Sequence, residues 1–193
     1  MCLCTERTFV HESIYAAFVA AFIKQTAEWS VGDPREPGIR LGPVVSTQHH
    51  AKVTSMLDRA AEKGFVAFGH SKRDLDLKEK NAKGCYVSPT VLTGVPDEDE
   101  IWNDEVFGPV TAINSFKTED EVIKRANDTQ YGLCATVFTE DIAKANRVAR
   151  KIRAGTGLKL VLILILFFSL GKLLAQARLE HAIWWNETIW YWP

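Results

Sequence analysis

The apolar positions near the start of the chain predict one strand followed by one amphipathic helix. Residues Thr8 to Val10 form a short run rich in β-branched and aromatic side chains, which is typical of a strand. Apolar residues then recur every four positions between Ile14 and Phe22, the spacing of one buried helical stripe. We expect Ser13 to cap this helix and the helix to end near Trp29.

A polar start followed by an apolar stripe predicts a second helix. Ser46 or Thr47 can begin this helix, and Gly64 can stop it. A strand at Phe65–Phe68 should follow. Residues 70–84 are rich in charge and predict a solvated loop or hairpin, with a binding patch as the less favoured alternative. The positions expected to face inward from the second helix are Val53, Met56, Leu57 and Ala60.

The pattern beyond this loop alternates strands with helices. Because parallel neighbours need crossover connections, which are usually helical, the alternation predicts an α/β fold with a largely parallel sheet covered by helices. The predicted strands are Tyr86–Leu92, Val110–Phe116 and Cys134–Phe138, and the predicted helices are Glu119–Asn127, capped by Thr118, and Ile142–Ile152, ended by Gly155.

Composition narrows the class of protein without identifying a function. The 193 residues, of which 47% are hydrophobic and 24% charged, have room for one sizeable domain or one domain with an appendage. Lys and Arg number 23 against 24 for Asp and Glu, and no basic stripe contains interleaved aromatic residues. This balance disfavours a nucleic-acid partner.

The cysteines and the start of the chain favour the cytosol. The four cysteines are irregularly spaced in a chain too long to depend on disulfides, so we expect reduced thiols, with Cys85 and Cys134 packed inside the fold. The first apolar helix pattern, Ile14 to Ile23, lacks a basic leader and a cleavage site, so secretion is not expected. Cys2 and Cys4, which lead into the first strand, are either a nucleophile site or small apolar residues without a role.

A second candidate for chemistry is the segment Asn103–Val110. It places a carboxylate, Glu105, an aromatic ring, Phe107, and a Gly-Pro turn immediately before a strand, so both side chains can face one pocket at the strand mouth. The alternative is a solvated glutamate and a core phenylalanine, because most exposed carboxylates and buried rings have no further role.

Taken together, several motifs resemble the aldehyde dehydrogenase superfamily in both order and spacing. They are Cys2–Val10, Gly42-Pro43, Ser88–Thr90, Glu105–Pro109 and Asn127–Leu133. The resemblance covers residues 2–156 and corresponds to part of the thiol-bearing catalytic domain of that family. A generic α/β binding module remains an alternative only if this collinearity is coincidental.

The resemblance implies an oxidoreductase that converts an aldehyde to a carboxylic acid through a cysteine thiohemiacetal and a thioester. Cys2 matches the nucleophile, and Cys4 lies two residues later. Glu105 matches the carboxylate that accepts hydrogen bonds from the nicotinamide ribose, and Phe107 matches the ring beside the nicotinamide. The implied cofactor is NAD or NADP, with NAD favoured, and no metal is expected.

Two further points follow from the resemblance. The opening Cys-Leu-Cys-Thr is similar to the branch that oxidises 2-aminomuconic or hydroxymuconic semialdehyde. His49, His50 and Lys52 lie on the second helix near the path of the family's cofactor. Since adjacent histidines on a helix cannot face one metal, we expect all three to be solvated polar side chains and assign them no role.

The family places its dinucleotide-binding domain, its general-base glutamate and an oxyanion-hole asparagine before the nucleophile. We expect this chain to lack them and therefore to oxidise no aldehyde on its own. The alternative function is that of a catalytically silent truncated isoform that binds full-length subunits or a membrane.

The tail from Gly157 onward differs from the family pattern, which predicts a partial catalytic domain at 1–156 and a separate tail at 157–193. The tail contains an apolar run at 160–170, then Lys172 and several tryptophans. Residues 158–175 are a candidate membrane segment, because a span needs about 20 mostly apolar residues. The alternatives are a strand or helix that replaces a missing edge, or a disordered, aggregation-prone end. Asn186–Thr188 matches an N-glycosylation acceptor that matters only in a lumen.

Overall fold

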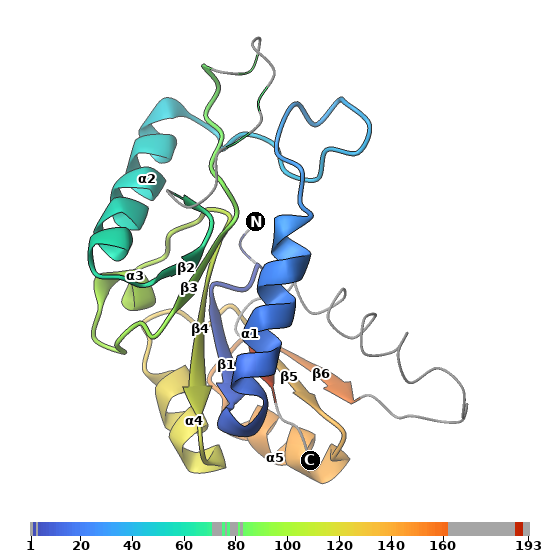
Figure 1. The fold of residues 1–193 in the computed structure, drawn as a ribbon. Coiled ribbons are helices and arrows are strands. Elements are labelled where there is room, and N and C mark those ends of the chain that lie inside the picture. The colour runs from blue at the N-terminus through green and yellow to red at the C-terminus, as the bar shows by residue number, and fades with distance from the viewer. Residues whose placement is uncertain are drawn as a thin grey trace. The chain divides into compact units, whose positions relative to one another are not determined.

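The computed structural model describes Cys2 and residues 4–70, 75, 77, 81, 83–161 and 188–190, and these residues form an α/β fold (Figure 1). Strands and helices alternate along the chain, as the sequence predicts. The elements are β1 (Arg7–His11), α1 (Glu12–Ala27), α2 (Thr47–Glu62), β2 (Val66–Phe68), β3 (Thr90–Thr93), α3 (Glu100–Asn103), β4 (Val110–Phe116), α4 (Glu119–Asn127), β5 (Cys134–Thr139), α5 (Ile142–Lys151), β6 (Thr156–Val161) and β7 (Thr188–Trp190).

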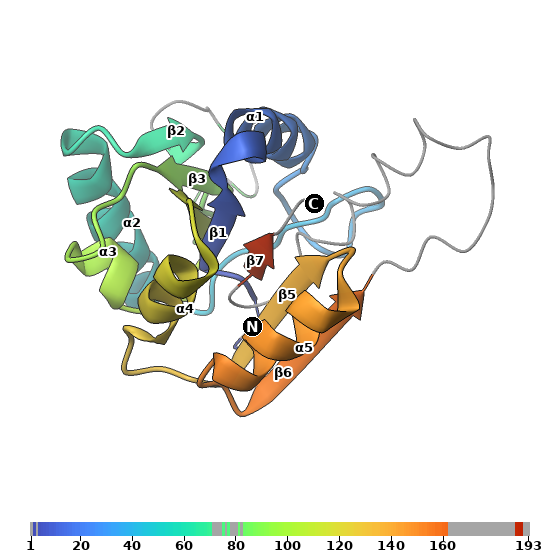
Figure 2. The ribbon, with the colours of Figure 1, turned by 90° about the horizontal axis from the view of Figure 1, so that it is seen from below.

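The chain divides into two compact units, of which the first comprises Met1–Phe22 and Ile113–Pro193. Its strands follow the order β4-β1-β7-β5-β6, and the pairs β1-β7, β7-β5 and β5-β6 are parallel. Helix α5 packs on β5 and β6 (Figure 2). The predicted largely parallel sheet is therefore confirmed in this unit.

The second unit comprises Ile23–Ala112 and contains α2, β2, β3 and α3. Strands β2 and β3 pair antiparallel, with Val66 opposite Leu92, and α2 packs on β2. The four residues predicted to face inward from α2 are at most 6% exposed. They are Val53, Met56, Leu57 and Ala60.

Side-chain caps fix the helix boundaries that the sequence predicts best. The Ser46 hydroxyl accepts a hydrogen bond from the His49 amide at the start of α2, and the Thr118 hydroxyl accepts one from the Glu121 amide at the start of α4. Each cap satisfies one of the amides that a helix start leaves without an intrahelical partner. Both predicted caps are confirmed.

Three local predictions are wrong. Helix α1 begins at Glu12, before the predicted cap Ser13, and the His11 imidazole accepts a hydrogen bond from the Ser13 amide. The strand predicted at Tyr86–Leu92 begins only at Thr90, because Pro89 has no amide to donate to a ladder. Cys85, predicted to be packed inside the fold, is only partly buried, whereas Cys134 is buried at the start of β5, as predicted.

The described part of the tail forms strands. Residues 158–161, the start of the candidate membrane segment, belong to β6, which pairs with β5 from Cys134↔Thr156 to Thr139↔Val161. Strand β7 pairs with β1 on one side and β5 on the other. The rest of the candidate segment, 162–175, and Asn186 lie outside the described residues, as do 71–74, 76, 78–80 and 82 of the predicted loop. No helix in the described residues is long and apolar enough to cross a membrane.

An ion pair between α4 and α5 makes the stability of the first unit depend on pH. Glu119 and Arg147 form two N···O contacts of 2.7 Å, and this hydrogen-bonded guanidinium lowers the pKa of Glu119 from its ordinary value of 4.5. A carboxylate whose pKa is lowered in the folded state stabilises the fold at pH values above its ordinary pKa. This contribution is lost as the pH falls through the folded-state pKa.

We expect Glu119→Gln to lower the free energy of unfolding at neutral pH by at most about 1 kcal/mol, because the Arg147 side chain is 47% exposed. The difference between the variant and the wild type should shrink as the pH falls below 4.5. Urea unfolding across this pH range measures it. A difference that stays constant in acid would mean that the carboxylate charge does not stabilise this pair.

Candidate active site

The segment Glu105–Pro109 forms a turn between α3 and β4. Asp99 caps α3 by accepting a hydrogen bond from the Ile101 amide, and Ile101 and Trp102 are buried. This short helix anchors the chain on one side of the turn, and the paired strand β4 anchors it on the other. The turn itself contains an unusual backbone conformation, because Phe107 has a φ of 55°.

Helix α2 contacts the turn at three positions. The Lys52 ammonium donates to the Glu105 carbonyl at 2.6 Å, and the His49 Nε2 lies 2.8 Å from the Phe107 carbonyl. The rings of His49 and Phe107 also meet edge to face, with centroids 6.1 Å apart. At the third position, a Cβ added to Gly108 would lie 2.9 Å from a Val53 methyl carbon. The turn is therefore packed closely against α2.

Sequence reasoning assigned no role to His49, His50 or Lys52. In the structure each of them reaches a backbone carbonyl far along the chain, with His50 contacting the Tyr86 carbonyl at 3.1 Å. The only signal in the sequence is the spacing of His49 and Lys52, which places both on one helix face directly after the Ser46 cap. The site residues that sequence reasoning missed are thus these two α2 side chains.

The predicted residues Glu105 and Phe107 differ in exposure. Glu105 is partly buried, and Phe107 is 43% exposed. An aromatic ring offers an apolar surface for a planar group, and a carboxylate accepts hydrogen bonds from hydroxyl groups.

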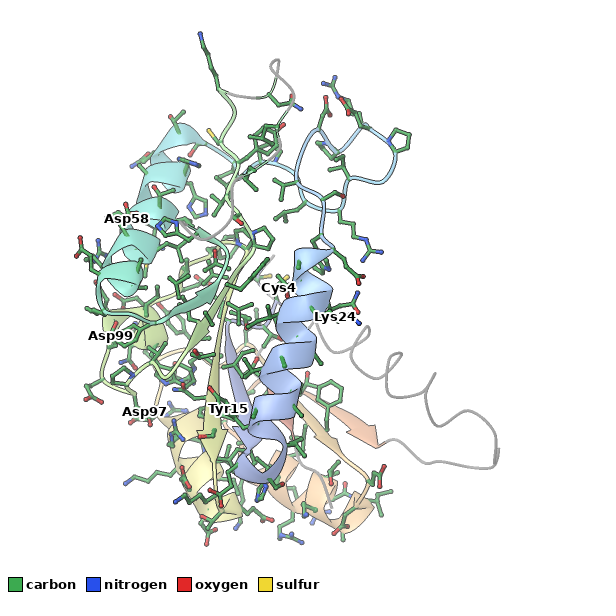
Figure 3. The ribbon with its side chains drawn as sticks, in the orientation of Figure 1. Cys4, Tyr15, Lys24, Asp58, Asp97 and Asp99 are labelled. Carbon is green, nitrogen blue, oxygen red and sulfur yellow. The ribbon has the colours of Figure 1, made fainter. Side chains whose placement is uncertain are left out.

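The predicted nucleophile segment lies at the start of the first unit. Cys2 is exposed, and Cys4, labelled in Figure 3, is partly buried. The segment leads into β1 at Arg7, which is 6% exposed and donates to the Ala126 carbonyl at 3.1 Å, at the carboxyl end of α4. A guanidinium at a helix carboxyl end is electrostatically favourable, so this contact fixes where the cysteine segment enters the sheet. Glu105 and Phe107 belong to the second unit.

Another motif of the resemblance forms an ordered loop in the first unit. Arg153 donates through its guanidinium to the Asn127 carbonyl at 3.1 Å and through its backbone amide to the Asn127 side-chain oxygen at 2.7 Å. The Asn127 side chain also donates to the Lys151 carbonyl. These contacts explain why the Asn127–Leu133 motif begins with an asparagine, which can both donate and accept.

Carboxylates elsewhere in the second unit serve structural contacts. Asp58 on α2 and Asp99 at the start of α3 are both labelled in Figure 3. Asp58 lies 2.8 Å from the His70 Nε2, and Asp99 lies 2.7 Å from the Lys63 ammonium. Within the described residues, no group of three or more His, Cys, Asp or Glu side chains is arranged to hold a metal ion.

Comparison with known proteins decides the family. The sequence model of the aldehyde dehydrogenase family matches residues 1–158. The chain belongs to the aldehyde dehydrogenase family. The match begins with the cysteine segment and ends inside β6, so this aldehyde dehydrogenase chain includes the turn at Glu105–Pro109 and all the elements from β1 to α5.

Several curated aldehyde dehydrogenases are similar to the chain. The 2-aminomuconic semialdehyde dehydrogenase of Homo sapiens is 41% identical over 156 residues, which cover 80% of this chain and 32% of that protein. The chloroplastic betaine aldehyde dehydrogenase of Atriplex hortensis is 41% identical over 155 residues, with coverages of 80% and 30%. The chain thus spans about a third of the length of the curated relatives it matches.

Solved structures agree with this assignment. The betaine aldehyde dehydrogenase of Staphylococcus aureus, crystallised in complex with NAD+, superimposes with a TM-score of 0.76 at 36% identity. The superposition covers 82% of this chain and 31% of that one. A point mutant of the same enzyme, crystallised with NAD+ and a BME-modified cysteine, also gives a TM-score of 0.76. The predicted fold class, an α/β fold of the aldehyde dehydrogenase type, is confirmed.

Proposed function

We propose that residues 2–156 carry the thiol-bearing part of an active site that oxidises an aldehyde to a carboxylic acid with NAD or NADP. Cys2 is the nucleophile, and Glu105 and Phe107 position the cofactor. The observation that carries this proposal is the family match over residues 1–158, which includes all three residues. The NAD+ complexes of the Staphylococcus aureus enzyme favour NAD over NADP.

The first step of the proposed reaction takes place at the Cys2 sulfur. The Cys2 thiolate attacks the aldehyde carbon and forms a thiohemiacetal, and the Cys2 backbone amide donates a hydrogen bond to the new oxyanion. A bound NAD(P)+ supplies the acceptor for the hydride that this carbon loses. The resulting thioester on Cys2 is then attacked by water, which releases the acid and returns the thiol.

The turn residues suit the proposed cofactor chemically. Carboxylate oxygens only accept hydrogen bonds, so Glu105 is matched to the two hydroxyl groups of a ribose. The partly exposed Phe107 ring can cover one face of a nicotinamide ring and keep water from it. Helix α2 holds the main-chain carbonyls of Glu105 and Phe107, and the His49 ring meets the Phe107 ring edge to face, so α2 fixes the backbone from which both side chains extend.

The names of the similar proteins suggest candidate substrates. We propose a muconic semialdehyde, because the Cys-Leu-Cys-Thr opening resembles that branch. The 41% identity to the human 2-aminomuconic semialdehyde dehydrogenase supports this choice, although betaine aldehyde dehydrogenases reach the same identity. Turnover of a chimera that contains residues 2–156, measured with both aldehydes, distinguishes the two assignments.

We expect residues 1–193 alone to form no NADH from NAD+ and an aldehyde. The resemblance places the dinucleotide-binding domain, the general base and an oxyanion-hole asparagine before the cysteine, so the chain alone has too few groups to bind the cofactor and activate water. Absorbance at 340 nm, with the intact Staphylococcus aureus enzyme as a positive control, measures this. Sustained NADH formation by the purified chain would contradict the expectation.

A chimera tests the proposed function itself. Residues 2–156 of this chain replace the matching segment of the Staphylococcus aureus betaine aldehyde dehydrogenase, and betaine aldehyde and NAD+ are the probes. We expect NADH formation that requires both probes. A folded chimera, recognised by cooperative thermal unfolding, that forms no NADH with either betaine aldehyde or 2-aminomuconic semialdehyde would overturn the proposal.

A further inference from the structure

The strongest unexplained feature outside the predicted site residues is the pair of contacts from α2 to the Glu105–Pro109 turn. His49 and Lys52 are three residues apart and lie on one face of α2. Their targets, the carbonyls of Phe107 and Glu105, are two residues apart and enclose Val106, which is 3% exposed. The two donors thus match two acceptors on one short stretch of backbone.

The conformation at Phe107 has a cost that these contacts can offset. A non-glycine residue with a φ of 55° is uncommon, and a conformation of this kind costs about 1 kcal/mol or more. Such a conformation persists only where surrounding contacts determine it. Here the determining contacts are the two carbonyl hydrogen bonds, the ring contact of His49, and the close approach of Gly108 to Val53.

We propose that His49 and Lys52 are positioning residues that hold the Glu105–Phe107 backbone so that the carboxylate and the ring keep one orientation. Because a carbonyl oxygen only accepts, the His49 Nε2 carries the proton in its contact. Lys52 adds a charge-assisted hydrogen bond at 2.6 Å. The inference deepens the proposed function, since it assigns the residues that orient the proposed cofactor-binding pair.

The backbone carbonyls can be observed directly in the intact chain by nuclear magnetic resonance. Labelling with 13C-carbonyl phenylalanine and 15N-glycine selects only Phe–Gly pairs, which occur twice in the sequence, at Phe68-Gly69 and Phe107-Gly108. The Phe107 carbonyl reports the His49 contact, and the Phe68 carbonyl is an internal control in the same unit.

We expect His49→Ala to move the Phe107 carbonyl resonance upfield, as for the loss of an accepted hydrogen bond, and to leave the Phe68 resonance in place. His49→Gln, which keeps a donor, should restore most of the shift. His50→Ala is the matched control, because His50 contacts the Tyr86 carbonyl instead. An unmoved Phe107 resonance in His49→Ala, with Phe68 unchanged, would overturn the assignment for His49.

The same design tests Lys52. Labelling with 13C-carbonyl glutamate and 15N-valine selects Glu105-Val106 and Glu121-Val122, of which only the first contains the carbonyl that Lys52 contacts. Lys52→Met should move the Glu105 resonance and leave Glu121 unchanged, and Lys52→Arg should restore it. Equal movement of both resonances would indicate a general structural change and contradict a local positioning role.

The link to cofactor binding is tested in the chimera. Lys52→Met should raise the KM for NAD+ about tenfold with a smaller change in kcat, the size expected for the loss of one positioned hydrogen bond. An unchanged KM would contradict the positioning role in the loaded enzyme. A chimera without activity that still shows the carbonyl shifts would instead reject the proposed function and leave the two contacts in place.

Discussion

Replacement of Cys2 by alanine in the chimera is expected to lower kcat by at least about a thousandfold, the scale on which removing a nucleophile acts in enzymes with covalent intermediates. The reason is that no thiohemiacetal or thioester can form without the sulfur. Steady-state NADH formation with betaine aldehyde measures the effect. Binding of NAD+ by the variant, followed by the quenching of protein fluorescence, confirms that the site is otherwise intact.

Cys4 provides the matched control for this experiment. It is a second thiol two residues away and is partly buried, whereas Cys2 is exposed. Cys4→Ala should retain activity within about tenfold, since it removes only packing of a small side chain. If Cys4→Ala abolished turnover and Cys2→Ala preserved it, the assignment of the nucleophile would be reversed.

Replacement of Gly69 by alanine is expected to destabilise the second unit by about 4 kcal/mol or more, at the upper end of single substitutions. Gly69 has a φ of 86°, and an added Cβ would lie 2.1 Å from the Pro89 carbonyl oxygen and 2.8 Å from the Thr90 Cα. Both neighbours are backbone atoms beside the β2-β3 pair, so neither can move aside without disturbing the strands. The variant therefore loses strand pairing as well as an allowed backbone conformation.

Replacement of Gly64 by alanine separates the cost of the backbone conformation from the cost of the steric clash. It has a φ of 79°, but an added Cβ would meet no atom within 4 Å. Gly64→Ala should therefore cost only about 1 kcal/mol, from the backbone conformation alone. Chemical denaturation of both variants, compared with the wild type, measures the difference. Equal costs at the two positions would show that the close approach of Pro89 does not exist in the protein.

The sequence predicted the elements whose boundaries are set by local chemistry. Helix α4 matches its predicted range of Glu119–Asn127, because Thr118 caps it and its apolar side is regular. Strand β4 also matches, at Val110–Phe116. In both cases neighbours along the chain supply the signal, so no distant contact is needed to place the ends.

The elements that sequence reasoning missed depend on weak or distant signals. Helix α3 has four residues and two buried side chains, too few for a periodic pattern, although Asp99 before Ile101 is a usable cap signal. The strand at β3 begins late because Pro89 interrupts the ladder. Strand β7 lies between β1 and β5, and its pairing with β1 joins the two ends of the sequence. No local pattern predicts such a pairing.

In the candidate site, too, local sequence motifs were predictable and distant contacts were not. Glu105 and Phe107 were identifiable because their motif is continuous in the sequence. The contacts of His49 and Lys52 span 58 and 53 residues, and they depend on how α2 packs within the second unit. A polar residue on an exposed helix face has no local feature that distinguishes a solvated side chain from one that holds a distant carbonyl.

The central claim is that the Cys2 sulfur forms the covalent bond to the substrate. It is tested most directly by mixing the chimera with NAD+ and betaine aldehyde, quenching in acid within one turnover, and mapping the acyl group by peptide mass spectrometry. We predict an acyl adduct on Cys2 that disappears in Cys2→Ala. An adduct on Cys4, or a chimera that turns over without any acylated cysteine, would contradict the claim.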